Sequence, residues 1–195
     1  MSACRVIFMD FLWTFGKMDA RRLSCVRQSV KLVQPVDTVT CIIRDDETIT
    51  CDFPEKSLIL RDSLALKMAL DETDNPEFWR KYISRPHFPQ ARSDFLRLWY
   101  ATKKPHLYYM DTDVRLFRVP EFEAGKPYLG QFGRRVDFFM FYVNERCDWF
   151  QCLMERIERC NPLSAFIPFL LADQRIMQAV GVIERRWFRH ERSGK

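Results

Sequence analysis

The chain has 195 residues, 47% of them hydrophobic and 14% aromatic, and a formal net charge of +5. So much apolar surface excludes an intrinsically disordered chain, and the length suits one domain covering residues 1–195. The mild positive charge suits a polyanionic small ligand. It is also compatible with weak nucleic-acid contact, but no run of Lys and Arg is dense enough to indicate a dedicated nucleic-acid tract.

The chain contains seven cysteines, an odd number, and no Cys-x-x-Cys pair. We therefore expect small buried thiols in a reducing compartment rather than a disulfide framework or a zinc site. The apolar N-terminal stretch is short and is interrupted by Asp10. It does not fit a signal peptide or a membrane span, so we expect a cytoplasmic protein without a membrane segment.

In the first half of the chain, hydrophobic spacing predicts strands and helices in alternation. Leu23, Val26 and Val30 recur at helical spacing, and Asp19 is a suitable N-cap before them. The expected elements are a strand at 4–14, a helix at 20–33, a strand at 36–44, a helix at 58–70 and a short helix at 77–82. In the helix at 58–70, we expect Leu60, Leu64 and Met68 to form the buried stripe.

The second half continues the alternation, with a helix at 91–102 followed by a strand at 106–110. That strand is continuously apolar after His106, a pattern typical of a parallel sheet covered by helices on both faces. The further expected elements are a strand at 136–143, an amphipathic helix at 147–160, a last helix at 173–180 and a basic tail at 181–195. The order of elements predicts a single α/β domain.

Two aspartates follow the apolar strand at alternate positions, Asp111 and Asp113. Ligands of open α/β sheets gather at the carboxyl ends of the strands, and residues two apart on an extended segment share a side. The two carboxylates could therefore share a divalent cation, Mn²⁺ or Mg²⁺, that also binds a diphosphate. The competing interpretation is an ordinary solvated turn.

Asp94 and Arg97 are three residues apart on the predicted helix at 91–102, so they share one side of it. Phe95, Leu98 and Trp99 can supply its buried side. The pair could bind an oxygen-rich ligand or form a simple surface ion pair within the helix.

Together these residues form a recognisable pattern. Residues 91–97 read Ala-Arg-Ser-Asp-Phe-Leu-Arg, and residues 109–113 read Tyr-Met-Asp-Thr-Asp. The pattern resembles the sugar-binding region, with its Asp-x-Asp motif, of glycosyltransferases related to initiation mannosyltransferases, capsular polysaccharide transferases and clostridial glucosylating toxins. The resemblance covers about thirty residues strongly, and the rest of the chain matches only in the order of its elements.

The resemblance implies a GT-A fold, a Rossmann-like mixed sheet with helices on both faces, and transfer from a nucleotide-diphosphate sugar, usually with retention. It implies that Asp94 and Arg97 bind the donor, that Asp111 contacts the donor and metal-bound water, and that Asp113 ligates the metal. One departure is that the family usually has a Gly-Gly pair before the aromatic residue. Here Lys103-Lys104-Pro105-His106 occupies that turn.

The resemblance also suggests further candidate residues. Asp173 and Gln174 would contact the donor sugar near the reacting carbon, although Asp173 also suits a plain N-cap. His190 would complete the metal and diphosphate site, and Trp13 would stack on the nucleobase. A surface histidine and a core tryptophan are the respective alternatives. Asp137 is a weak candidate near the acceptor.

We therefore expect a metal-dependent glycosyltransferase that uses a UDP- or GDP-linked sugar, with an unknown acceptor and with homo-oligomerisation left open. A nucleotidyltransferase would carry a glycine-rich phosphate loop after the first strand, and the segment from Asp10 offers only Gly16. A non-catalytic nucleotide-sugar-binding or regulatory protein on the same fold remains the alternative function.

Overall fold

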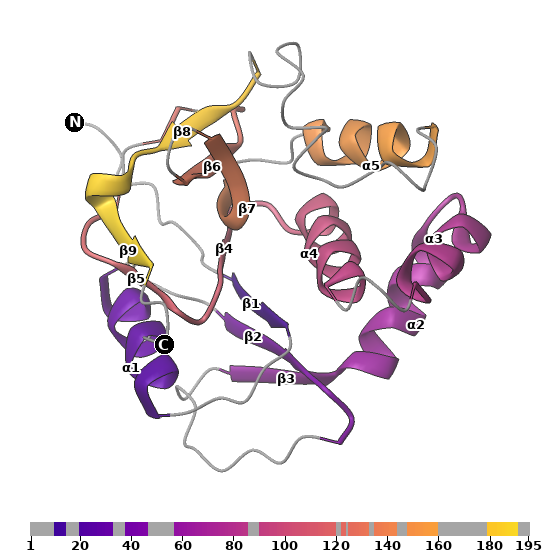
Figure 1. Ribbon diagram of the computed structural model, residues 1–195, viewed down its shortest axis with the longest axis horizontal. Helices are drawn as coiled ribbons and strands as arrows, with labels where there is room; N and C mark the ends of the chain where they lie inside the picture. Colours follow the sequence, from indigo (N-terminus) through magenta and orange to yellow (C-terminus); the bar gives the residue numbers. More distant parts are fainter. Residues whose placement is uncertain are drawn as a thin grey trace.

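The computed structural model describes residues 10–14, 20–32, 38–46, 57–85, 90–119, 122–123, 125–132, 135–143, 148–159 and 179–190. At 10–14, 57, 132, 135–138 and 190 this description covers the backbone only. The strands are β1 (Asp10–Thr14), β2 (Thr38–Ile43), β3 (Ser57–Arg61), β4 (Leu107–Met110), β5 (Val114–Leu116), β6 (Tyr128–Phe132), β7 (Arg135–Val143), β8 (Gly181–Ile183) and β9 (Phe188–His190) (Figure 1). The helices are α1 (Ala20–Leu32), α2 (Asp62–Glu72), α3 (Pro76–Ile83), α4 (Ala91–Lys103), α5 (Trp149–Arg159) and the short 3₁₀ helix η1 (Arg185–Trp187).

Seven strands form one mixed sheet in the order β3-β2-β1-β4-β7-β6-β8. Strands β3, β2, β1 and β4 are parallel to one another, whereas β7 runs antiparallel to β4. The chain moves from β1 outward to β3 and then returns to place β4 on the other side of β1. The strand order therefore reverses between β1 and β4, which is where open α/β sheets bind their ligands.

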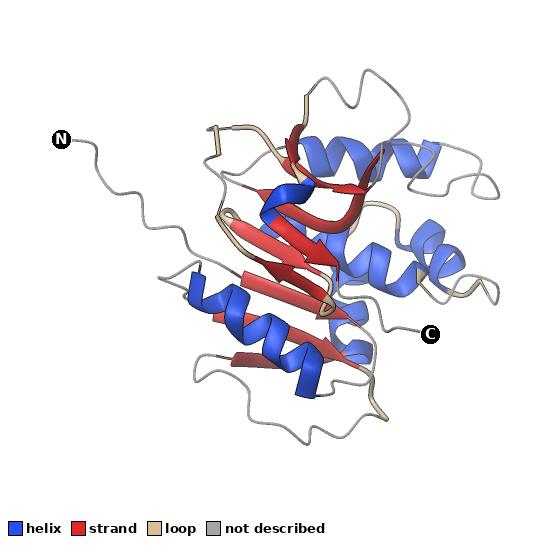
Figure 2. Ribbon diagram, turned by 60° about the vertical axis from the view of Figure 1, so that its left-hand side comes forward, coloured by secondary structure: helices blue, strands red, loops and turns tan. Residues whose placement is uncertain are grey.

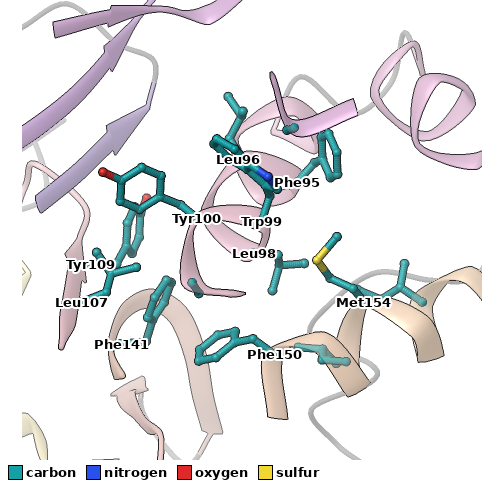
Figure 3. Packing of buried hydrophobic residues seen from close by; sticks show 14 of the residues in the cluster. Phe95, Leu96, Leu98, Trp99, Tyr100, Leu107, Tyr109, Phe141, Phe150 and Met154 are labelled. Atoms are coloured by element: carbon teal, nitrogen blue, oxygen red, sulfur yellow. The ribbon is translucent and has the colours of Figure 1, made fainter. Parts of the chain in front are cut away.

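Helices cover both faces of this sheet, as the alternating sequence pattern predicts (Figure 2). On one face, Val26 and Val30 of α1 pack against Val39 and Cys41 of β2. On the other face, α4 and α5 pack side by side against the sheet, and Phe141 of β7 lies against Phe150 of α5 (Figure 3). Strand β4 is buried along its whole length, which confirms the prediction made from its apolar run.

The predicted helix at 58–70 is wrong in its first part. Residues 57–61 form β3, and α2 begins only at Asp62. The predicted stripe is also wrong, because the side chains of Leu64 and Met68 are exposed whereas Ala65 and Ala69 are fully buried. The small alanines allow α2 to pack closely against its neighbours. A prediction based on the spacing of large residues alone therefore assigned the exposed face of α2 to the core.

The predicted basic tail at 181–195 is also wrong in its described part. Strand β8 pairs in parallel with β6, and β9 pairs antiparallel with β5. Strands of three residues are stabilised by partners far away in the sequence. They are too short for local hydrophobic periodicity to predict them. The described end of the predicted helix at 173–180, residues 179–180, is not helical.

Gly181 allows the ring of Tyr128 to lie against β8. A Cβ atom at this position would be 2.2 Å from Cε1 of Tyr128, whose hydroxyl also accepts a hydrogen bond from the Glu123 amide at 2.9 Å. We expect Gly181→Ala to lower the free energy of unfolding by about 1–3 kcal/mol through overpacking. Urea denaturation measures this loss. Val182→Ala, which truncates an exposed side chain of the same strand, is the control and should cost less.

Candidate donor-binding site

The two predicted halves of the site meet at the carboxyl edge of the sheet. Helix α4 leads into β4 and runs back across the sheet, so its first turn, with Asp94, lies at the edge where β4 ends. Asp111 directly follows the last residue of β4. The order reversal between β1 and β4 therefore coincides with the residues that the sequence analysis selected.

Arg97 is a buried arginine held by its own helix. Its Nη2 lies 3.2 Å from Oδ1 of Asp94, and the two side chains are 11% and 22% exposed. The same nitrogen donates to the Ser93 hydroxyl at 2.9 Å. The ion pair that the sequence allowed is present, but it is shielded from solvent and is not a surface pair. Phe95 and Leu98 of α4 are fully buried and Trp99 is 5% exposed, as predicted.

Tyr109 connects α4 to the aspartate turn and was not among the predicted site residues. The guanidinium carbon of Arg97 lies 4.8 Å from the centre of the Tyr109 ring. The ring of Phe141 stacks on the same tyrosine, with the two centroids 5.0 Å apart (Figure 3). The Tyr109 hydroxyl donates to Oδ1 of Asp111 at 2.5 Å. The spacing could have predicted this contact, because Tyr109 precedes Asp111 by two residues and residues two apart on a strand share a face.

The Asp-x-Asp segment is a tight turn rather than a continuation of the strand. The Val114 amide donates to the Asp111 carbonyl at 2.9 Å, and the Asp111 amide donates to the Phe139 carbonyl at 2.7 Å. Thr112 is 6% exposed, whereas both aspartates are partly exposed. The turn therefore fixes the backbone of the segment and leaves both carboxylates within reach of solvent.

The turn before β4 shows how the chain manages without the glycine pair of the resembling family. His106 has φ of +54°, in the left-handed region that glycine occupies at no steric cost. Histidine is one of the non-glycine residues enriched in this region. For a residue with a side chain, this backbone conformation costs about 1–2 kcal/mol. The missing glycines therefore do not prevent the turn that leads into the site.

Side chains from β2 and α2 hold α4 in place beside the site. Nη1 of Arg92 on α4 lies 3.4 Å from Oδ2 of Asp62. The other carboxylate oxygen of Asp62, Oδ1, accepts a hydrogen bond from the Asp45 amide at 3.1 Å. Burial raises the pKa of Asp62, and the neighbouring Asp45 raises it further. At the other end of α4, the hydroxyls of Tyr100 and Thr40 are hydrogen-bonded at 2.9 Å. These contacts fix α4 relative to β2, so Asp94 and Arg97 have a defined position.

The donor set of the turn fits a hard divalent cation. Asp111 and Asp113 supply two carboxylates on one short turn, and Mg²⁺ is typically held by one or two carboxylates together with substrate phosphates and water. Within the described part of the chain, no group of three His, Cys, Asp or Glu side chains forms a metal cluster. The protein ligands among the described side chains would therefore be these two aspartates.

The remaining predicted residues are placed only in part. Trp13 lies near the end of β1, paired in register with Cys41 of β2. His190 of β9 pairs with Val114, the residue that follows Asp113, so its backbone passes beside the aspartate turn. Asp137 lies within β7, paired with Gly130. Asp173 and Gln174 lie outside the described residues, as do the side chains of the other three.

No protein-family model and no curated protein matches the sequence. Solved structures, in contrast, share the fold. The ligand-free and UDP-bound glycosyltransferase domains of the YGT toxin match with TM-scores of 0.59 and 0.58 at 9% identity, over 79% of this chain and 62% and 61% of theirs. A double cysteine-to-serine mutant of a transferase matches with a TM-score of 0.58 at 9% identity, over 94% of this chain and 93% of that chain.

The PaToxG glycosyltransferase matches with a TM-score of 0.54 at 10% identity, over 90% of this chain and 64% of that one. The chain thus spans less than two thirds of the YGT toxin and PaToxG glycosyltransferase structures that it matches. Identities this low show the fold alone. The chain has the mixed α/β fold of these glycosyltransferase domains, as the sequence analysis predicted.

No helix in the described part of the chain is both long enough and apolar enough to cross a bilayer. Of the predicted buried cysteines, Cys25 and Cys41 are indeed 5% and 1% exposed. Cys152 of α5 is exposed.

Proposed function

We propose that this protein is a metal-dependent glycosyltransferase that transfers a sugar from a UDP- or GDP-linked donor, with retention of configuration, to an acceptor not yet identified. One observation carries the proposal. A continuous set of contacts runs from Asp94 through Arg97 and Tyr109 to Asp111. It joins α4 to the aspartate turn at the point where the strand order reverses.

Each residue has a proposed role in holding the donor. Asp94 would accept hydrogen bonds from sugar hydroxyls, and Arg97 would donate to the sugar or to the diphosphate. Both side chains are already held in place before the donor binds, because Arg97 is fixed by Ser93 and by the Tyr109 ring. Such preorganisation reduces the entropy lost when the donor is bound. Trp13 would stack on the base, and Asp173 and Gln174 would contact the sugar near the reacting carbon.

Asp111 and Asp113 would hold Mn²⁺ or Mg²⁺, with His190 as a further proposed ligand. When bound, the cation would neutralise charge on the departing nucleoside diphosphate. In this proposal Tyr109 orients Asp111, because its hydroxyl donates to one carboxylate oxygen. With retention, the leaving diphosphate could itself accept the acceptor's proton, so the protein need not supply a general base.

A thermal-shift panel of UDP- and GDP-linked sugars, each with and without Mn²⁺, tests this proposal. We expect at least one donor to stabilise the wild-type protein in the presence of the metal. At a concentration a hundred times its Kd, a ligand adds about 2.7 kcal/mol to the free energy of unfolding. Asp113→Ala should lose the metal-dependent part of this shift.

Asp71→Ala is the matched control, since Asp71 is an exposed residue of α2 whose carboxylate pairs with Lys67 of the same helix. This variant should respond to donors like the wild type. If no donor stabilises the wild-type protein in a metal-dependent way, the transferase proposal is wrong. If donors stabilise it but no nucleoside diphosphate is released in an acceptor screen, the non-catalytic alternative is favoured.

A further inference from the structure

Three segments that are far apart in the sequence lie together beside the aspartate turn: residues 20–32, 114–118 and 184–190. Strand β5 pairs with β9, and the Phe117 amide donates to the Trp187 carbonyl at 2.8 Å. The Leu116 amide donates to the Ser29 hydroxyl of α1 at 3.1 Å. Figure 1 shows α1 beside β5 and β9. The three segments therefore form one neighbourhood, which we call the arginine surface.

Positive charge is concentrated in this neighbourhood. The three segments contain nine Lys or Arg residues and one acidic residue, Glu184, whereas the whole chain contains 31 basic and 26 acidic residues. The rest of the chain is therefore net acidic. The basic residues are Arg21, Arg22, Arg27 and Lys31 of α1, with Arg115, Arg118, Arg185, Arg186 and Arg189.

The centre of the arginine surface places two like charges directly opposite each other. Arg115 of β5 and Arg189 of β9 are cross-strand partners, and neither forms an ion pair with a described carboxylate. Their neighbours Leu116 and Phe188 are buried, so the alternation of the strands puts both arginines on the outer face. Like charges directly opposite each other destabilise a strand pair. An anion that binds both arginines would relieve this repulsion.

Aromatic rings lie among these arginines. The guanidinium carbons of Arg118 and Arg186 lie 4.9 and 5.5 Å from the centre of the Trp187 ring. That of Arg115 lies 5.6 Å from the centre of the Phe117 ring, and Phe117 is 49% exposed. Exposed aromatic rings and flat guanidinium groups are the surfaces on which proteins stack unpaired bases.

We propose that the arginine surface binds a single-stranded nucleic acid, with its arginines on the phosphates and Phe117 on a base. The charged groups of β5, η1 and β9 are arginines rather than lysines, and the planar fork of arginine suits bidentate contact with phosphate. Apart from Phe117 and Leu32, these segments expose no large hydrophobic side chain among the described residues, which is too little for insertion into a lipid surface. A strand bound here would lie beside Asp113, because Arg115 follows it by two residues.

Fluorescence anisotropy with a labelled oligothymidylate, in EDTA and without any nucleotide sugar, tests the proposal. Because neither donor nor metal is present, the result does not depend on the glycosyltransferase proposal. We expect micromolar binding at low salt. In Arg115→Gln/Arg189→Gln, two lost phosphate contacts should reduce the magnitude of the slope of log affinity against log salt by about 1.4. At 0.1 M salt this weakens binding about 25-fold.

Lys67→Gln/Lys81→Gln removes the same charge from exposed positions on α2 and α3 and should bind nearly like the wild type. Equal weakening by both double variants would overturn the site, as would absence of binding at low salt. An abasic oligomer of equal length should bind at least about fivefold more weakly than oligothymidylate, and Phe117→Ala should reduce that difference. Equal affinity for the abasic oligomer, or arginine-dependent binding to phosphatidylserine vesicles in place of the oligomer, would overturn the nucleic-acid assignment.

Discussion

An Arg97→Ala variant is expected to unfold with a free energy about 3 kcal/mol below that of the wild type. The substitution removes the partner of a carboxylate that is only 22% exposed, and it leaves Asp94 as a poorly solvated charge. It also removes the group that lies over the Tyr109 ring and fills the space between α4 and β4. Urea denaturation at neutral pH measures the loss, with the slope of the transition checked for two-state behaviour.

Two further variants separate the contributions to this effect. Arg159→Ala makes the same chemical change at an exposed ion pair within α5, 3.5 Å from Glu155, and should cost less than about 1 kcal/mol. Arg97→Lys keeps the charge but lacks the planar guanidinium, whose Nη2 contacts Asp94 and the Ser93 hydroxyl while its Nε donates to the Ser93 carbonyl at 3.4 Å. We therefore expect an intermediate loss. If Arg97→Ala were no less stable than Arg159→Ala, the buried pair would not support the site.

The same variant also tests the donor-binding role. Provided that it is still folded at 20 °C, we expect Arg97→Ala to bind the nucleotide sugar found in the thermal-shift panel about tenfold more weakly, because a hydrogen bond to a charged group is lost. Loss of stability with unchanged donor affinity would show that Arg97 is a structural residue only.

The best predicted part of the fold is the stretch from α4 to the aspartate turn. The predicted helix at 91–102 and the predicted strand at 106–110 agree with α4 and β4 to within one residue at each end. Both have strong local signals, namely helical spacing and a continuous apolar run between polar residues. The sequence also predicted that Asp94 and Arg97 would share a side, and their ion pair confirms it.

What the sequence missed depends on contacts between distant segments. Tyr109 reads as one more apolar residue of a buried strand, and its role is visible only once Arg97 and Asp111 are placed around it. The arginine surface was missed for the same reason. No single one of its segments is dense enough to indicate polyanion binding, and pairing of β5 with β9 brings Arg115 and Arg189 together.

Trp79 holds together three helices on one face of the sheet, α3, α4 and α5, and its substitution tests that packing. It is fully buried in α3, and its ring stacks on Phe95 of α4 with centroids 4.6 Å apart. Its indole Nε1 donates to Oε1 of Glu158 on α5 at 2.6 Å. One side chain thus joins three helices, including the one that carries Asp94 and Arg97.

We expect Trp79→Phe to lose about 2–3 kcal/mol of unfolding free energy at pH 7, because it removes a hydrogen bond to a charged group and reduces packing. Burial raises the pKa of Glu158, and the Trp79 hydrogen bond opposes that rise. Without the indole donor, the folded-state pKa moves further above the unfolded value. The folded variant then binds a proton more tightly than the unfolded chain, so its stability relative to the wild type should recover as the pH falls through that raised pKa.

Urea denaturation of wild type and variant at several pH values between 7 and 5 measures this change. Trp99→Phe is the control, since the indole of Trp99 donates to Glu72 at 3.1 Å. Glu72 is 43% exposed and also pairs with Lys103, so water and lysine can replace the lost donor and the cost should be smaller. The role assigned to Glu158 predicts that the stability difference between Trp79→Phe and the wild type shrinks towards pH 5, because protonation removes the charge of the carboxylate that has lost its donor. A difference that stayed constant or grew towards pH 5 would contradict that role.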